Sequence, residues 1–377
     1  MERVLAYALL ALVTGSLVYC ILTVVAVRRY RAVRPPRLEA AVPISVLKPL
    51  AGLDDGLEEN LRSFFEQDYP YFEILFGLRG PEDPALAVVE RLRAAYPAVP
   101  AQIIITGEPS YPNAKVYSLE HMLAASRYDL LVMADSDVRV TSAMLSTVAA
   151  EFRDANLGMA TCPYRATPGS SFWSTLEALG LNTEFLGGVL VARMLDGVKF
   201  ALGPAIAARR ATLARIGGFD VLKDYLAEDF VMGKLAAERG ATVILSSYIV
   251  EHRIGAQPFG ANLKHRLRWN RSTRRSRPWG YLGQVFTNPL PLALALCIAK
   301  PAWWPVAVLA ALGRAVAAWA TAEQVLGDPL TRRLWYLVPL QDLIGFVMWI
   351  AGFFGNTVLW RGRRYYLLSD GRFRLVK

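Results

Sequence analysis

The stretch VMADSDVRV, residues 132–140, ends an apolar run with two carboxylates separated by one serine. The run YDLLVMA (128–134) has the composition of a buried strand, and buried carboxylates are costly unless they are paired or bind a metal. If the strand geometry persists, Ser136 points to the opposite face from its neighbours. Asp135 and Asp137 therefore predict a site for a hard divalent cation, Mg²⁺ or Mn²⁺, that holds a diphosphate. The alternative is a surface turn in which an aspartate caps the following helix.

The residues around this stretch predict a mostly parallel α/β domain over residues 38–252. Apolar β-rich runs alternate with segments whose apolar residues recur at helical spacing. Such alternation implies right-handed crossovers and a sheet covered on both faces. Ligands bind beyond the carboxyl ends of the strands in such a sheet, which is where Asp135 and Asp137 lie. The expected strands are 43–50, 72–78, 102–106 and 129–134, and the expected helices are 57–67, 85–96 and 114–126.

The composition predicts membrane segments on both sides of this domain. Hydrophobic residues make up 54% of the 377 residues. Val4 to Val27 carries no charge and is long enough to cross a bilayer core of about 30 Å, which favours a retained anchor over residues 1–30 rather than a cleaved signal peptide. The basic segment RRYRAVRPPR (28–37) follows it and places the α/β domain on the cytoplasmic side.

The remainder of the chain is basic and then apolar. Residues 253–284 form an interfacial basic and aromatic segment, residues 285–360 contain three apolar blocks near 285–299, 302–322 and 335–360, and residues 361–377 form a basic tail. The formal net charge of +10 is concentrated beside these apolar segments. That placement favours anionic lipid headgroups and topology signals over nucleic acid, which we exclude as a partner.

Two further motifs carry charged side chains. LAEDFVMGKLAAERG (226–240) places Glu228 and Asp229 at the start of a predicted helix, where acidic residues also complement the helix dipole. Arg266, Arg268 and Trp269 follow in RLRW. Guanidinium groups match phosphate oxygens, although this segment is also compatible with a solvated or lipid-facing amphipathic helix.

Taken in order, these segments resemble a known family. VLKPLAGLDDGLEENLRSFFEQDYP (46–70), PNAKVYSL (112–119), ADSD (134–137), GGFDVLKDYLAEDF (217–230) and RLRW (266–269) resemble glycosyltransferase family 21, the ceramide glucosyltransferases, and within it the bacterial glycosyltransferases associated with hopanoid biosynthesis. The resemblance implies a GT-A-type glycosyltransferase fold with N- and C-terminal transmembrane helices. It also implies an inverting, multi-pass enzyme of the bacterial inner membrane with a cytoplasmic catalytic domain.

The resemblance also implies roles for individual residues. Asp135 and Asp137 would bind the metal, and Asp135 would also contact the donor diphosphate. Asp229 would be the general base, with Glu228 beside it in the substrate site. Arg266, Arg268 and Trp269 would close over the donor, and Lys48 and Lys115 would lie near the nucleotide or its phosphates.

Two positions depart from the family pattern. Gly80 in LRGPEDP (78–84) stands where the family usually has an aspartate, and Glu82 or Asp83 would replace it in binding the uridine. His265 stands four residues before Trp269, where Gln or Arg is common. A neutral imidazole still offers a hydrogen bond to a phosphate. His252 follows a β-rich run and is a further candidate for the site.

The sequence thus predicts transfer of a sugar from a UDP-sugar to the hydroxyl of a membrane lipid, with inversion. A hopanoid polyol with N-acetylglucosamine is favoured over ceramide with glucose by resemblance alone. A processive polysaccharide synthase shares the Asp, Glu-Asp and Arg-x-Arg-Trp motifs but needs a translocation channel, usually built from more membrane helices. A non-catalytic membrane scaffold would be expected to lack Asp135, Asp137 or Asp229.

Overall fold

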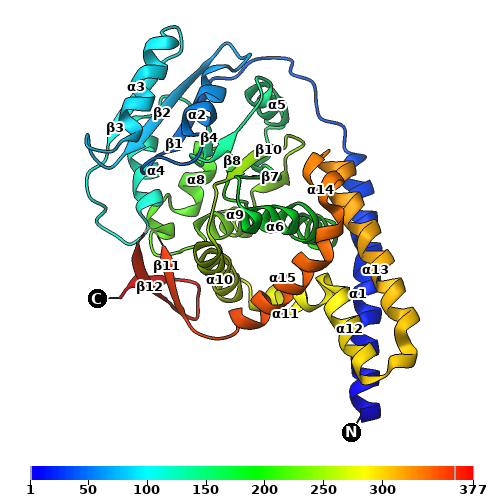
Figure 1. Ribbon diagram of the computed structural model, residues 1–377. Helices are drawn as coiled ribbons and strands as arrows, with labels where there is room; N and C mark the ends of the chain where they lie inside the picture. Colours follow the sequence, from blue (N-terminus) through cyan, green and yellow to red (C-terminus); the bar gives the residue numbers. More distant parts are fainter. Residues whose placement is uncertain (1, 361, 377) are drawn as a thin grey trace. The chain divides into compact units, whose positions relative to one another are not determined.

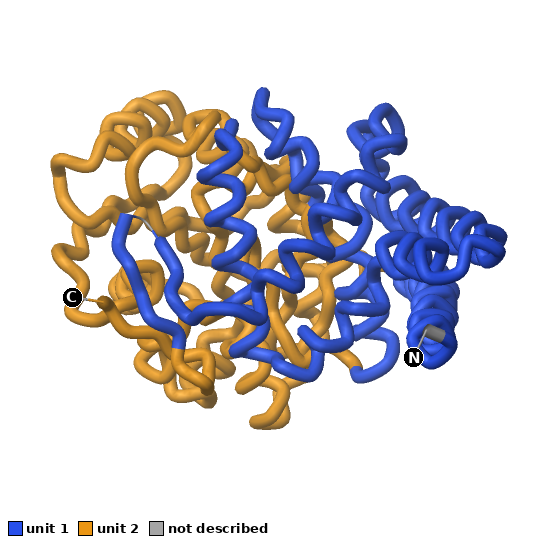
Figure 2. The backbone as a smooth tube through the Cα atoms, turned by 60° about the horizontal axis from the view of Figure 1, so that its bottom comes forward, with its two compact units in different colours: residues 1–33, 165–196, 256–367 blue, residues 34–164, 197–255, 368–377 orange. Residues whose placement is uncertain are grey.

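The computed structural model describes residues 2–360 and 362–376 (Figure 1). The chain separates into two compact units, each assembled from segments distant in the sequence (Figure 2). Unit 1 is drawn from residues 1–33, 165–196 and 256–367, and unit 2 from residues 34–164, 197–255 and 368–377. The range predicted for the catalytic domain, 38–252, therefore contributes residues 165–196 to unit 1.

Within the described residues, unit 2 is built around a seven-stranded sheet with the order β3-β2-β1-β4-β8-β6-β9. The first four strands pair in parallel, β8 runs antiparallel to both β4 and β6, and β6 and β9 pair in parallel. The strands are β1 (Ile44–Pro49), β2 (Phe72–Leu78), β3 (Ala101–Ile105), β4 (Leu130–Ala134), β6 (Leu157–Thr161), β8 (Ala205–Arg209) and β9 (Thr242–Leu245). The prediction of a mostly parallel sheet is confirmed.

The elements predicted from periodicity are also confirmed. The helices between the first strands are α2 (Leu57–Phe65), α3 (Ala85–Ala95) and α4 (Ala114–Ala125). Every residue of β2 and β4 is buried, which accounts for their almost continuously apolar sequences. The exception is Glu73 of β2, whose carboxylate accepts hydrogen bonds from Ser45 and Arg127. Leu47, Leu75, Leu131 and Leu119 pack together in the core between the sheet and α4. The other elements with residues in unit 2 are β5 (Val138–Arg139), α5 (Met144–Glu151), β7 (Tyr164–Pro168), α8 (Arg210–Ile216), the short η2 (Asp220–Leu222), α9 (Glu228–Glu238), β10 (Val250–Ile254) and β13 (Phe373–Leu375).

The strand order creates a switch point between β1 and β4. The chain builds β1, β2 and β3 outward in one direction and then adds β4 on the other side of β1. The loops that leave β1 and β4 therefore turn to opposite faces of the sheet, and a crevice opens between them. Open α/β sheets bind their ligands in this crevice. Asp135 follows β4 directly, so the predicted site lies at the switch point.

Unit 1 is mostly helical. In the described part of the chain, four helices are long and apolar enough to cross a membrane: Arg3–Arg31, Phe172–Asp196, Pro301–Val325 and Pro329–Gly352. A further pair, Pro278–Thr287 and Pro289–Ala299, meets the same criteria together but is bent by 63°. The predicted anchor lies within α1 (Glu2–Arg31), and the predicted block 335–360 is helical only as far as Gly352.

The helix over 172–196 contains the acidic and amide side chains of Glu177, Asn182 and Glu184. It consists of α6 (Phe172–Gly180), the π-helix η1 (Leu181–Phe185) and α7 (Leu186–Asp196). The remaining elements of unit 1 are α10 (Phe259–Ser276), α11 (Pro278–Gly283), η3 (Gln284–Thr287), α12 (Pro289–Ala299), η4 (Pro301–Trp303), α13 (Trp304–Trp319), the π-helix η5 (Ala320–Val325), α14 (Pro329–Leu334), η6 (Trp335–Leu337), α15 (Val338–Gly352), β11 (Thr357–Trp360) and β12 (Arg363–Leu367).

Candidate active site

Hydrogen bonds fix the backbone of the turn that follows β4. The carbonyl groups of residues 135, 136 and 137 accept hydrogen bonds from Lys48 Nζ, Asn60 Nδ2 and the Arg253 N–H, at 2.5, 3.3 and 2.7 Å. Each of the three donors comes from a different part of unit 2. The carboxylates of Asp135 and Asp137 are therefore left for other partners.

Lys48 lies beneath this turn rather than at an open surface. Its side chain is fully buried on β1, and Nζ lies 4.1 Å from the centre of the Phe64 ring. Burial lowers the pKa of Lys48 to about 7, although Asp135, Asp137 and Asp54 oppose this. Lys48 thus holds the turn from β1, and its place near the nucleotide or its phosphates stays a prediction.

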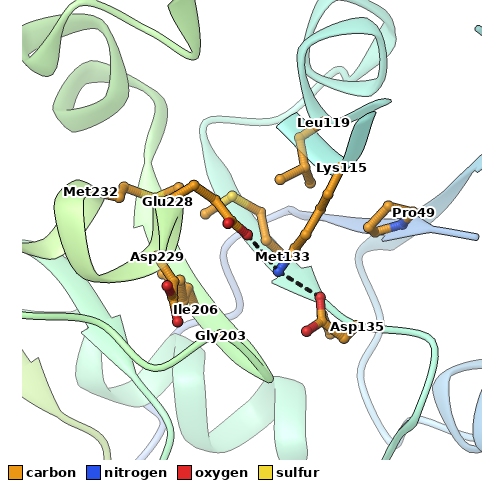
Figure 3. A pocket seen from close by; sticks show the side chains of 11 residues that line it. Pro49, Lys115, Leu119, Met133, Asp135, Gly203, Ile206, Glu228, Asp229 and Met232 are labelled. Carbon is orange, nitrogen blue, oxygen red and sulfur yellow. Dashed lines mark ion pairs between the residues drawn. The ribbon is translucent and has the colours of Figure 1, made fainter. Parts of the chain in front are cut away.

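Lys115 joins the turn to the start of α9. Its Nζ lies 2.7 Å from Asp135 Oδ1 and 3.0 Å from Glu228 Oε1, as the dashed lines in Figure 3 show. Burial alone would lower the pKa of Lys115, but the charges of Asp135, Glu228 and Asp229 outweigh it and raise the pKa. Lys115 therefore stays charged and holds carboxylates from two separate motifs together.

Asn113 sets the geometry of this bridge. Its Oδ1 accepts hydrogen bonds from the N–H groups of Lys115 and Val116, both at 3.1 Å, and so caps α4. Its Nδ2 donates to Glu228 Oε2 at 3.3 Å and to the Tyr225 carbonyl at 2.8 Å. One amide thus fixes the start of α4 and the carboxylate of Glu228.

Asp229 lies in the first turn of α9 and lines a pocket together with Lys115, Asp135 and Glu228 (Figure 3). Burial, and then the charge of Glu228, raise the pKa of Asp229 to about 7. A Cβ atom at Gly203 would lie 2.9 Å from Asp229 Oδ2, so a side chain at Gly203 would displace this carboxylate. A carboxylate with a pKa near neutral is suited to accept a proton from an alcohol.

Asp137 offers an oxygen that the protein leaves unused. Its Oδ2 lies 3.2 Å from His252 Nε2, whereas Oδ1 is buried and makes no hydrogen bond within the described residues. Burial alone would raise the pKa of Asp137, but His252, Lys48 and Lys115 hold it below its ordinary value. Burial raises the pKa of Asp135, with Lys115 opposing it. Asp137 is thus the more firmly ionised carboxylate of the two.

These residues fit a divalent cation that shares its ligands with a substrate. No group of three or more His, Cys, Asp or Glu side chains in the described part of the chain is arranged to hold a metal ion. Mg²⁺ is typically bound by one or two carboxylates together with substrate phosphates and water. Asp137 Oδ1 and the carboxylate of Asp135 supply such a pair.

The residues expected to contact the uridine have different surroundings. Asp83 accepts hydrogen bonds from the N–H groups of Gly52 and Ala85, at 3.0 to 3.2 Å, so its carboxylate anchors the loop before α3. Glu82 is exposed and folds back over Gly80, where a Cβ atom would lie 2.3 Å from Glu82 Oε2. Unlike the carboxylate of Asp83, the carboxylate of Glu82 accepts no hydrogen bond from the backbone N–H groups of this loop.

The RLRW motif lies on α10 in unit 1. His265 Nδ1 lies 2.8 Å from Glu177 Oε1, and Asn262 Nδ2 donates to Glu177 Oε2 at 2.5 Å. The Trp269 ring lies 5.4 Å from the ring of His265 and 6.3 Å from that of Phe185. These contacts attach α10 to the helix over 172–196, and His265 is paired with a carboxylate.

The arginines after this motif bind backbone oxygen atoms. Arg271 donates to the carbonyl groups of Phe354 and Thr357, and Arg274 donates to those of Phe353 and Gly355. The carbonyl groups at the end of a helix lack partners within it. These two arginines therefore hold the turn that follows α15 and the start of β11.

Comparison with known proteins identifies the family. The sequence model of the family described as glycosyl transferase family 21 matches residues 7–373 of this chain. The chain belongs to glycosyltransferase family 21. It is 30% identical to ceramide glucosyltransferase 1 of Caenorhabditis elegans over 207 residues, 54% of this chain and 44% of that protein. It is 22% identical to ceramide glucosyltransferase 3 of the same organism over 378 residues, 97% of this chain and 82% of that protein. This family 21 member thus spans less than half the length of the first of these relatives.

A solved structure supports the fold. The mannosyltransferase PcManGT from Pyrobaculum calidifontis, in complex with GDP-Man and Mn²⁺, superimposes with a TM-score of 0.56 at 18% sequence identity. The similarity covers 93% of this chain and 99% of that one. The predicted GT-A glycosyltransferase fold is confirmed.

Sequence reasoning assigns no role to Asn113 and no partner to His252 in this family 21 site. Asn113 was quoted within PNAKVYSL without a role, although asparagine directly before a predicted helix signals an N-cap. His252 was only a candidate, because a histidine at a strand end carries no signal of its partner. The pairing with Asp137 joins residues 115 positions apart, which no local pattern records.

Proposed function

We propose that this protein transfers a sugar from a UDP-sugar to a hydroxyl group of a membrane lipid, with inversion. One observation carries the proposal: Lys115 joins Asp135 of the turn after β4 to Glu228, beside Asp229, in one pocket at the switch point of the sheet. Family membership supports glycosyl transfer, and the names of the relatives support a lipid acceptor.

The residues of unit 2 divide the chemistry between them. Asp229 accepts the proton of the acceptor hydroxyl as the oxygen attacks the anomeric carbon, and the bond to the diphosphate breaks on the opposite side. Lys115 and Asn113 hold Glu228, whose charge helps to keep the pKa of Asp229 near neutral. Asp135 and Asp137 would hold Mg²⁺ or Mn²⁺, which when bound neutralises charge on the departing diphosphate.

The membrane helices of unit 1 extend the proposal to location. We propose a multi-pass protein of the bacterial inner membrane with unit 2 in the cytoplasm. The basic residues Arg28, Arg29 and Arg31 in the last turn of α1 support this orientation. In unit 1, Arg266, Arg268 and Trp269 on α10 are proposed to contact the donor.

The test is analysis of lipid products by mass spectrometry. Purified protein in lipid nanodiscs is incubated with UDP-glucose or UDP-N-acetylglucosamine and with ceramide or a hopanoid polyol. One glycolipid that carries a single added sugar is expected, and Asp229→Asn should abolish it. A sugar polymer would indicate a processive synthase, and failure to consume either donor would indicate a scaffold. Either result would reject the proposal.

A further inference from the structure

The membrane helices of unit 1 contain a second pocket. It is lined by residues of α1, α7, α13, η1 and η3, among them Tyr19, Thr23, Glu184, Thr287 and Arg314. Ionisable side chains within membrane segments are costly and usually mark function. A cluster of polar groups around a cavity at this position therefore needs an explanation beyond packing.

An ion pair fixes one wall of the pocket. Arg314 donates two hydrogen bonds, each of 2.8 Å, from its guanidinium to the two carboxylate oxygens of Asp342. Both residues are buried. Arg314 also donates to the Thr183 hydroxyl at 2.9 Å. The guanidinium is thereby committed to protein partners, so Arg314 does not provide a site for a phosphate.

Two π-helices meet at this wall. Thr183 lies in η1 and Thr321 in η5, and the Thr321 hydroxyl donates to the Thr183 carbonyl at 3.2 Å. A π-helix is rare, is frequently found at functional sites, and interrupts the regular hydrogen-bond pattern of the surrounding helix. Its presence in two neighbouring segments indicates that this region is shaped for a purpose other than simple packing.

The other wall presents groups that match a hydroxyl or an amide. Glu184 Oε1 accepts hydrogen bonds from the Thr287 hydroxyl at 2.6 Å and the Asn288 amide at 3.2 Å. The Tyr19 hydroxyl is buried and makes no well-formed hydrogen bond within the described residues. Its polar neighbour Thr23 instead donates to the Tyr19 carbonyl. A buried hydroxyl without a good partner is costly, and a ligand would remove that cost.

We propose that this pocket binds the neutral, hydroxyl- or amide-bearing head of a membrane lipid, and that this lipid is the sugar acceptor. The second clause rests on the proposed function. A carboxylate accepts hydrogen bonds from hydroxyl and amide groups but repels a phosphate, so Glu184 selects against anionic lipids.

An apolar surface for the hydrocarbon chains of the lipid lies beside the pocket. Tyr19 belongs to α1 and Arg314 to α13, and these two helices are in contact where Gly313 faces Leu17. Ile21 on α1 and Leu312 on α13 are exposed by 64% and 59%, as expected of side chains that face lipid. Hydrocarbon chains of a bound lipid would lie along this surface.

The test uses a ceramide that carries a photoreactive group and an alkyne, added to full-length protein in nanodiscs without a sugar donor. Cross-links are expected in residues 16–23, 181–187 and 314–321. A hopanoid polyol or unlabelled ceramide should compete with the probe, and dioleoyl phosphatidic acid should not. Competition by phosphatidic acid, or cross-links spread evenly over the membrane helices, would overturn the proposal.

Two variants connect binding to transfer. Tyr19→Phe removes one hydroxyl, and we expect the acceptor concentration for half-maximal transfer to rise about 3- to 10-fold, as for loss of one hydrogen bond. Glu184→Gln keeps the shape and removes the charge, and we expect a rise of about tenfold or more. Tyr7→Phe, on the same helix at a side chain exposed by 66%, is the matched control and should match the wild type.

The outcomes separate the two proposals. If the wild type forms no glycolipid, the proposed function fails, while the cross-links still report on the pocket. If the wild type forms glycolipid and both variants show unchanged acceptor dependence, the pocket is not the acceptor site and this inference alone fails. The thermal unfolding midpoint of each variant shows that the protein is folded, and a change confined to the maximal rate would also contradict a binding role.

Discussion

Replacing Asp229 with Asn should separate catalysis from stability. The substitution keeps the shape of the side chain but removes the basic group. A general base typically contributes about 10²–10⁴-fold to a rate, so transfer at pH 8 should fall by at least about 100-fold. With its pKa raised to about 7, the wild-type carboxylate is largely ionised at pH 8 and fully able to act.

The same substitution should not destabilise the protein. Burial and Glu228 raise the pKa of Asp229 from 3.8 to about 7, so the folded state disfavours its charge. At about 1.4 kcal/mol per pKa unit, ionisation of Asp229 lowers the free energy of unfolding by at most about 4 kcal/mol. This loss of stability is absent below about pH 4, grows as the pH rises from about 4 to about 7, and is complete above about pH 7. Asp229→Asn should therefore unfold at a higher temperature than the wild type at pH 8 and at a similar temperature at pH 4.

The assay measures sugar transfer by mass spectrometry and thermal unfolding in the same preparations. Glu238→Gln is the matched control, because Glu238 ends the same helix and forms an exposed pair with Lys234 at 3.8 Å. It should change neither quantity beyond experimental error. Near-normal transfer by Asp229→Asn would refute its role as the base. A lower unfolding temperature at pH 8 would show that Asp229 stabilises the helix start instead.

Three further outcomes are expected. EDTA should abolish transfer and Mn²⁺ or Mg²⁺ should restore it, whereas full activity in metal-free buffer would reject the roles of Asp135 and Asp137. Glu228→Gln should move the acid limb of the pH–rate profile to lower pH by about one unit, because it removes a like charge beside Asp229; an unmoved limb would mean that another group titrates. A cysteine at exposed Glu90 of α3, with Cys297→Ser as background, should react with an impermeant reagent only after the cytoplasmic side is opened. Labelling of intact cells would reverse the orientation.

The sequence predicted the sheet well because the information is local. The strand β4 is a continuous apolar run, and β1 and β2 are apolar apart from Ser45, Lys48 and Glu73. Asp135 follows β4 directly, and Asp137 lies two residues further on. The rule that ligands bind at strand ends then places the site. The approach of Lys115 to both Asp135 and Glu228 needs the fold, because these residues lie in three separate motifs.

The membrane helix over 172–196 shows why other features were not predicted. In the sequence, Glu177, Asn182 and Glu184 interrupt an otherwise apolar stretch, which is compatible with a wall for the lipid acceptor or with an ordinary amphipathic helix. In the structure their partners come from distant segments: Asn262 and His265 for Glu177, and Asp328 for Asn182 at 2.9 Å. A polar side chain that is satisfied by a residue far along the chain looks solvent-exposed in the sequence.

The charges around the Asp135 turn show what the donor requires. The acidic side chains of Asp54, Asp135, Asp137, Glu228 and Asp229 outnumber the basic side chains of Lys48 and Lys115 in this cluster. Lys115 is already bound to two carboxylates, and the pKa of about 7 leaves Lys48 only partly charged at neutral pH. A diphosphate placed here without further positive charge would be repelled. Binding of the proposed donor would therefore require additional positive charge, such as that of a divalent cation.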